Sequence, residues 1–154
     1  HAAWGESLKG LRVIDLYAGS GALGFEAISR GAAFCLFVET DEAARGAIRD
    51  TVDALGLFGC TRVHRRDATD LGVRPGSAGE AFDLAFLDPP YRQGLGERAL
   101  TRLAEGGWLA PDALAVLEDA VDAPAADLAG YEELDARDYG IARVRFLRRL
   151  PAAG

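Results

Sequence analysis

The amino-acid sequence predicts an α/β protein with a doubly wound, Rossmann-like sheet that is mostly parallel and ends in an antiparallel hairpin. Two observations predict this fold class. Short apolar runs alternate with segments of helical periodicity over residues 11–117, which is the order of a parallel sheet with helices on both faces. Two further apolar runs flank the turn residues Asp138, Tyr139 and Gly140, which is typical of a closing hairpin.

The first half of the chain alternates between apolar strands and glycine-terminated helices. The opening apolar run is stopped by Gly19, and the helix after it is ended by Gly31. The second helix places apolar side chains near i, i+3 and i+4 spacing and is closed by Gly56. We therefore expect strands over 11–16, 33–38 and 61–64, and helices over 22–30 and 41–55.

The second half continues the alternation and then changes to hairpin patterning. A buried apolar strand ends abruptly at Asp88, because two prolines follow it. The next segment has helical periodicity and ends at Gly106 and Gly107. The expected elements are strands over 82–87, 113–117, 131–137 and 141–147, and a helix over 95–105.

Length and composition indicate one folded domain over residues 1–154. No apolar run approaches the roughly 18 residues of a membrane span, and no basic-then-apolar leader opens the chain. Cys35 and Cys60 lie in apolar surroundings and cannot build a disulfide framework, so a reducing cytoplasm is expected. The sequence has no Met, which predicts that a short N-terminal segment is missing from it.

The formal net charge of −7 taken alone disfavours a nucleic-acid partner. The charge is uneven, however, since residues 75–136 hold 13 acidic side chains against 3 Arg. Residues 62–74 hold 4 Arg against 2 Asp, and residues 137–154 hold 5 Arg against one Asp. Arg suits bidentate phosphate contacts, although a genome rich in G and C would also favour Arg codons.

Ligands of doubly wound sheets bind outside the carboxyl ends of the strands, so the residues there are the candidates for a site. The first strand is followed by Gly19, Gly21 and Gly24, which satisfy the G-x-G-x-x-G pattern. Such glycines let a ligand approach the backbone and the free N–H groups of the next helix. A tight strand-to-helix turn without a ligand is the alternative interpretation.

Two acidic residues follow the second and third strands. Glu39 can accept hydrogen bonds from both ribose hydroxyls of a nucleoside, and Asp67 can accept one from an adenine amine. Each has a structural alternative. Glu39, with Asp41, suits the start of the next helix, and Asp67 suits the N-cap of a short turn over 68–71.

The most specific feature is the tetrapeptide Asp88-Pro89-Pro90-Tyr91 straight after the fourth strand. The prolines fix φ and restrict the residue before them, so the Asp side chain and neighbouring carbonyls are held rigidly. These groups can accept two hydrogen bonds from an exocyclic amine, and the aromatic ring can stack on a flipped base. A plain proline-rich turn is the alternative.

Together these motifs resemble class I S-adenosylmethionine-dependent methyltransferases that act on exocyclic amines. The chain is most similar to the RsmD family, bacterial enzymes that methylate a guanine N2 of small-subunit (16S) ribosomal RNA. Residues 25–32 (FEAISRGA), 106–109 (GGWL) and Tyr139-Gly140 also resemble that family, over residues 8–150 in all. Relatives usually begin with a basic segment that carries an Arg-Pro-Thr motif, which is absent here, and many have Asn where this chain has Thr51.

The resemblance implies a role for each strand-end residue. Asp88 and the Pro89 carbonyl would hold the amine, with Pro90 stiffening the loop and Tyr91 stacking on the guanine, while Asp88 or water takes the proton released. No metal is implied. The resemblance also implies S-adenosyl-L-methionine as cofactor and S-adenosyl-L-homocysteine as product. The methionine part would be held by Asp15, Ala18, Gly19, Ser20 and Gly21, the ribose by Glu39 and Thr40, and the adenine by Asp67 and Ala68.

The implied partner is ribosomal RNA in a small-subunit assembly intermediate, bound by a cytoplasmic monomer without membrane contact. Arg65, Arg66 and Arg92 are candidates for phosphate contacts, with a solvated surface as the alternative. Without the basic segment, the chain should keep its cofactor better than its RNA.

Three other functions remain open. An adenine-N6 methyltransferase on DNA or RNA would use the same tetrapeptide, although no target-recognition domain is visible. A dinucleotide-binding oxidoreductase would explain the glycines and Glu39, but it leaves Asp88 without a role. A non-catalytic RNA- or nucleotide-binding module is disfavoured by the intact Asp88 and glycines.

Overall fold

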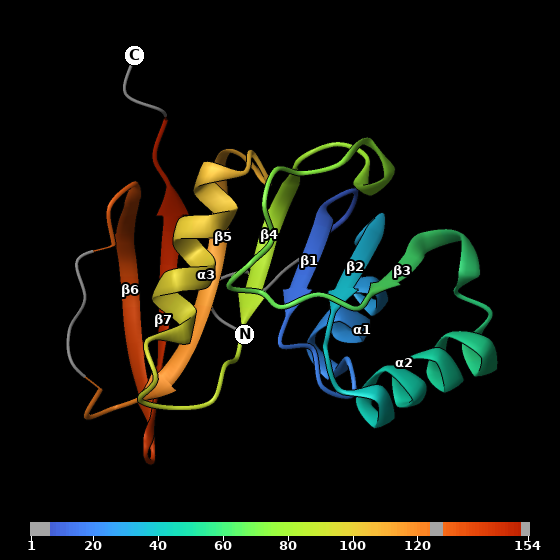
Figure 1. Cartoon of the computed structure of the whole chain (residues 1–154), viewed down its shortest axis with the longest axis horizontal. Coiled ribbons are helices and arrows are strands. Elements are labelled where there is room, and N and C mark those ends of the chain that lie inside the picture. The colour runs from blue at the N-terminus through green and yellow to red at the C-terminus, as the bar shows by residue number, and fades with distance from the viewer. Residues whose placement is uncertain (1–6, 124–127, 152–154) are drawn as a thin grey trace.

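The computed structural model describes residues 7–123 and 128–151, and in these it contains one seven-stranded sheet in the order β3-β2-β1-β4-β5-β7-β6. Strands β1 to β5 run parallel, whereas β7 is antiparallel to both β5 and β6. This arrangement confirms the predicted fold class (Figure 1). The strands are β1 Arg12–Leu16, β2 Phe34–Val38, β3 Thr61–His64, β4 Phe82–Leu87, β5 Leu109–Ala120, β6 Tyr131–Tyr139 and β7 Ala142–Arg149.

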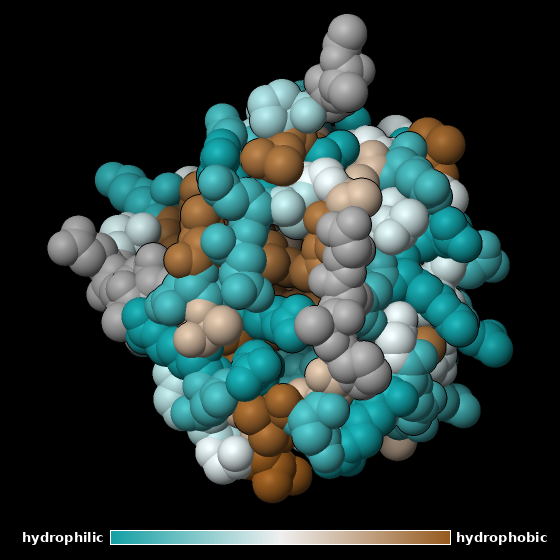
Figure 2. All heavy atoms as spheres, turned by 90° about the vertical axis from the view of Figure 1, so that its left-hand side faces the viewer, coloured by the Kyte–Doolittle hydropathy of each residue, from teal (hydrophilic) through white to brown (hydrophobic). Residues whose placement is uncertain are grey.

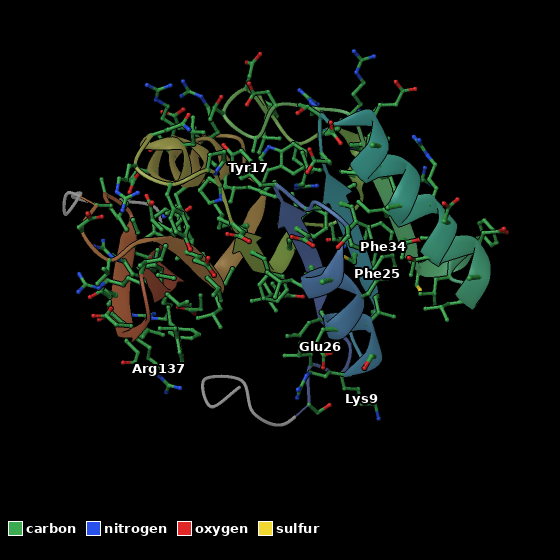
Figure 3. All side chains as sticks on the ribbon, turned by 90° about the horizontal axis from the view of Figure 1, so that it is seen from below. Lys9, Tyr17, Phe25, Glu26, Phe34 and Arg137 are labelled. Carbon is green, nitrogen blue, oxygen red and sulfur yellow. The ribbon has the colours of Figure 1, made fainter. Side chains whose placement is uncertain are left out.

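Alternate strand residues point to opposite faces of the sheet, so each face has apolar side chains to bury. Helices cover both faces. α1 (Ala22–Ser29) and α2 (Glu42–Leu55) pack in a core with Phe37 and Phe86. α3 (Leu95–Glu105) packs in a second core with Trp108. In Figure 3 the sheet lies between α1, which carries Phe25 and Glu26, and α3. Among the described residues, no helix is long and apolar enough to cross a membrane.

Strand β1 lies inside the sheet between β2 and β4 and is almost completely buried. Val13, Ile14 and Leu16 are fully buried, as expected for a strand covered on both faces. Because β1, β2, β4 and β5 are parallel, their carboxyl ends meet at one edge, which is the lower edge in Figure 1. The candidate residues therefore gather there.

Strands β5 and β6 are longer than their apolar runs predict. β5 begins at Leu109 and passes Asp112, whose φ of 64° marks an irregular step, before it pairs closely with β4. β6 is almost entirely exposed and pairs antiparallel with β7, across which ion pairs also form, including Arg148–Glu132 at 2.7 Å and Arg143–Asp138 at 2.7 Å. Figure 2 looks on to this edge of the sheet and shows a mostly hydrophilic surface.

Candidate active site

The glycine turn after β1 uses left-handed backbone at three positions. Tyr17, Gly19 and Gly21 have φ of 58°, 59° and 85°, which turns the chain sharply from β1 into α1. A Cβ on Gly24 would lie 2.4 Å from the Phe37 ring, so this glycine lets α1 pack closely on β2. A Cβ on Gly19 would meet nothing within 4 Å, so the turn presents open backbone toward the strand ends. The geometry matches the roles of glycines in a nucleotide-binding turn.

Asp15 lies beneath this turn rather than on its surface. The residue is 2% exposed, and its Oδ2 accepts a hydrogen bond from the Gly24 N–H at 3.1 Å. Burial, supported by the negative charges of Asp88 and Glu39, raises the pKa of Asp15 to about 8 against the opposing effect of the Gly24 hydrogen bond. Asp15 thus ties the end of β1 to the first turn of α1.

Glu39 connects the glycine turn to the start of α2. Its Oε1 accepts from the Gly19 N–H at 2.8 Å, and its Oε2 accepts from the Asp41 N–H at 2.9 Å. The N-cap of α2 is Asp41, which accepts from Ala44 N–H, so Glu39 is not itself the helix cap. A carboxylate has about four acceptor sites, so Glu39 keeps capacity for further donors.

Asp67 adopts the turn that the structural alternative predicted, and it also lines a cavity. Its Oδ1 accepts from both the N–H and the hydroxyl of Thr69, which lowers the pKa of Asp67. A cavity of about 170 Å³ is lined by Asp67 with Ala68, Glu39, Thr40 and others. The predicted ribose and adenine residues are therefore brought together.

The Asp88-to-Tyr91 segment forms one wall of a second cavity, of about 610 Å³. Pro89 is buried and anchors the segment, whereas Asp88 and Pro90 are exposed at the mouth. Partial burial, then the charge of Glu118 and the hydrogen bond that protonated Asp88 would donate to it, raise the pKa of Asp88 to about 6. The Tyr91 hydroxyl donates to Glu118 Oε2 at 2.5 Å, which is the main reason that the pKa of Tyr91 rises to about 12.

The two cavities share four lining residues, Tyr17, Glu39, Thr40 and Leu95. The acidic pocket beside the glycine turn therefore opens directly to the proline-walled cavity. A nucleoside held in the first could present its far end to an amine held in the second. This continuity joins what the sequence predicted as two separate sets of residues.

Comparison with known proteins places this geometry in a family. The family described as conserved hypothetical protein 95 matches residues 2–148. The chain belongs to this family.

Two relatives of the chain are named ribosomal RNA small subunit methyltransferase D. The Haemophilus influenzae protein is 33% identical over 133 residues, which cover 86% of this chain and 68% of the relative. The Escherichia coli protein is 37% identical over 109 residues, which cover 71% of this chain and 53% of the relative. The chain thus spans about two thirds of the first relative's length and about half of the second's. The predicted RsmD-like resemblance is confirmed.

Solved structures agree with the family assignment. A Haemophilus influenzae methylase superposes with a TM-score of 0.84 at 31% identity, covering 94% of this chain and 89% of that one. An Escherichia coli methyltransferase gives 0.81 at 31% identity, covering 93% and 77%. An S-adenosylmethionine-dependent methyltransferase from Mesorhizobium loti, at 17% identity and a TM-score of 0.73, shares the fold.

Two residues of the site, Tyr17 and Glu118, were not among the candidates from the sequence. Tyr17 lines both cavities, and its hydroxyl donates to the Leu95 carbonyl at 3.5 Å beside the start of α3 (Figure 3). Glu118 follows the apolar run of β5 and contacts Tyr91. The strand-end rule, applied to the fifth strand as to the first four, would have found Glu118.

The remaining candidate residues from the sequence lie at separate places in the structure. Ala18 donates its N–H to the Val38 carbonyl at 3.2 Å, and Ser20 is exposed on the turn. Arg65 is exposed, whereas Arg66 lines the first cavity and donates to the Leu71 carbonyl at 2.7 Å. Arg92 has a φ of 62° and pairs with Asp122 at 2.9 Å. The three arginines thus form no single patch.

Proposed function

We propose that this chain is the catalytic domain of an S-adenosylmethionine-dependent methyltransferase that acts on the exocyclic N2 amine of a guanine in small-subunit (16S) ribosomal RNA. The observation that carries the proposal is the continuity of the two cavities, since it lets an amine beside Asp88 meet a nucleoside cofactor beside Glu39. The names of the relatives support ribosomal RNA as the substrate.

The residues present fit the proposed cofactor. The glycine turn offers open backbone at Gly19, and Glu39 keeps acceptor capacity for ribose hydroxyls. Asp67 and Ala68 line the same cavity and would hold an adenine. The glycine turn, which Asp15 ties to α1 from beneath, would hold the methionine part. When bound, S-adenosylmethionine supplies an electrophilic methyl group on a sulfonium.

The chain's own task is to position a poor nucleophile, because the lone pair of a guanine amine is delocalised into the ring. Asp88 and the Pro89 carbonyl would accept the two N–H bonds of the amine, favouring a pyramidal nitrogen whose lone pair faces the first cavity. The Tyr91 ring would stack on the base. We therefore expect positioning and electrostatic stabilisation to provide most of the rate enhancement.

Removal of the proton needs no dedicated catalytic base. The methylated nitrogen is strongly acidic, so either Asp88 or water can take its proton. With a pKa of about 6, Asp88 is mainly ionised at neutral pH and is able to accept the amine hydrogen bonds and then the proton. Among the described residues, no group of three or more His, Cys, Asp or Glu could hold a metal ion.

Two measurements test the proposal. Calorimetry should show S-adenosylhomocysteine binding and no NAD binding, which separates a methyltransferase from an oxidoreductase. The full-length protein should then transfer tritiated methyl groups to small-subunit particles from a strain that lacks its RsmD-family enzyme. Nucleoside mass spectrometry should identify N2-methylguanosine, whereas N6-methyladenosine, or transfer to DNA instead, would contradict the proposal.

The setting in the cell is part of the same proposal. We expect an assembly intermediate of the small subunit to be a better substrate than naked RNA, and the protein to act as a cytoplasmic monomer. Sedimentation of the protein alone, and methylation rates on particles against free 16S RNA, test these two points.

A further inference from the structure

Glu118 stands beside the proposed amine site in a position that the methyl-transfer mechanism does not use. It lies near the end of β5, one strand over from Asp88 at the end of β4, and it lines the same cavity as Asp88 and Tyr91. The two neighbouring carboxyl groups lie on the wall of the same cavity, close enough for the charge of Glu118 to raise the pKa of Asp88. A pair of acids at one cavity wall suits a ligand edge that carries adjacent N–H donors.

The nucleobases differ in this respect. Guanine carries an N1–H donor next to its N2 amine, so these two neighbouring positions are both donors. Adenine and 2-aminopurine carry an amine next to a bare N1 acceptor, which a carboxylate repels. A group that accepts at the position next to the amine therefore distinguishes guanine from the other two.

We infer that Glu118 is a specificity-determining residue that accepts the N1–H of the target guanine while Asp88 accepts from its N2 amine. The inference rests on the proposed function and deepens it. Tyr91 supports it by geometry, because its hydroxyl donates to Glu118 Oε2 and so fixes the carboxylate beside the stacking ring. The bond from Tyr91 leaves Glu118 acceptor capacity, since a carboxylate has about four acceptor sites.

Neighbouring acids are less suited to this role. Asp119 accepts from the Arg92 N–H at 2.9 Å and the Ala120 N–H at 2.7 Å, so its Oδ1 is committed to the backbone of the loop. Glu39 is held by Gly19 and Asp41 on the cofactor side. Glu118 lies next to Asp88, and its hydrogen bond comes from Tyr91, the residue proposed to stack on the base.

The substitution Glu118→Gln gives a directed test. In this variant the Tyr91 hydroxyl would bond the amide oxygen, which turns the amide NH₂ toward the position of N1. That NH₂ donor would oppose the N1–H of guanine and match the N1 acceptor of 2-aminopurine. The variant should therefore reverse the preference rather than merely slow the reaction.

The experiment uses the full-length protein and small-subunit particles reconstituted with RNA that carries guanine or 2-aminopurine at the methylated position. Wild type should favour guanine about 10- to 100-fold in kcat/KM, as expected for one matched base contact. Glu118→Gln should bring the ratio to about one or below. S-adenosylhomocysteine affinity and thermal unfolding should match wild type, which shows that the variant is folded.

Two controls separate recognition from simple positioning of Tyr91. Tyr91→Phe removes the hydroxyl contact but keeps the ring, so it should lower the rate and leave wild-type preference for guanine largely in place. Glu133→Gln makes the same chemical change on the exposed strand β6 and should change neither. If wild type methylates guanine and Glu118→Gln keeps the wild-type ratio, the inference is wrong; if wild type methylates no guanine, the proposed function itself fails.

Discussion

The cofactor side and the amine side of the site hold their acidic residues in opposite ways. On the cofactor side, backbone N–H groups bind Asp15, Glu39 and Asp67. On the amine side, Asp88 and Glu118 receive no backbone N–H within residues 7–123 and 128–151 and instead face one another. The cofactor half is therefore organised by its own main chain, whereas the amine half keeps its acceptors for donors that a ligand brings.

The pKa values record the same contrast. The Thr69 hydrogen bonds lower the pKa of exposed Asp67, while partial burial and Glu118 raise that of Asp88. A ligand that donates hydrogen bonds to the amine-side pair would relieve their repulsion. The two halves should accordingly respond to substitution independently, each in its own assay.

The largest effect should come from Asp88→Ala. Loss of the carboxylate that positions the amine should lower the methyl-transfer rate about 1,000-fold or more, the upper range for removing one preorganised electrostatic group. S-adenosylhomocysteine affinity should stay within a few-fold, because Asp88 lies outside the first cavity. Single-turnover transfer and calorimetry measure the two quantities, and near-normal transfer would remove Asp88 from the mechanism.

Glu39→Ala should show the reverse pattern. Two charge-assisted hydrogen bonds to ribose hydroxyls would be lost, so S-adenosylhomocysteine affinity should fall about 10- to 100-fold. Transfer at saturating cofactor should fall much less. Calorimetry with unchanged affinity would exclude Glu39 from the cofactor site, and Glu42→Ala on the exposed start of α2 is the control.

The glycine turn itself can be tested through packing. In Gly24→Ala, the new methyl would lie 2.4 Å from Phe37 and 2.7 Å from the Cys35 sulfur, both in the buried core. Overpacking of this kind should lower the free energy of unfolding by about 1–3 kcal/mol. The control is Gly46→Ala, also within a helix but in open space, which should raise it by up to about 1 kcal/mol. Denaturant unfolding of both variants decides, and equal effects would contradict the close packing of α1 on β2.

The sequence predicted Glu39 and Asp67 on the cofactor side, and Asp88 on the amine side, because each follows an apolar run. It was less informative about the amine half, where tertiary pairing extends the strands beyond their apolar runs. β5 continues through Glu118 and Asp119 because both pair with β7, opposite Val144 and Arg143. Local propensity gives no signal for such a partner, so the length of β5 could not be predicted. Glu118 itself directly follows the apolar run over 113–117, so the strand-end rule could have found it.

Asp15 lies beneath the boundary between the two halves and is the residue where they meet electrostatically. Its pKa of about 8 arises mainly from burial, but Asp88 and Glu39 both add to it. An acid with a raised pKa in the folded state binds its proton more tightly there than in the unfolded chain, where the value is near 3.8. Its contribution to stability is therefore greatest below pH 4 and is lost progressively as the pH rises toward 8.

Asp15→Asn keeps an acceptor for the Gly24 N–H and removes the titration. Between pH 5 and pH 7.5, wild type should lose up to about 1.4 kcal/mol per pH unit more than the variant, because one proton separates its two states. Urea unfolding across this range measures the difference, with exposed Asp50→Asn expected to follow wild type. Parallel curves for wild type and Asp15→Asn would mean that Asp15 stays ionised in the core, and that the main-chain donors of the glycine turn outweigh the cost of burying its charge.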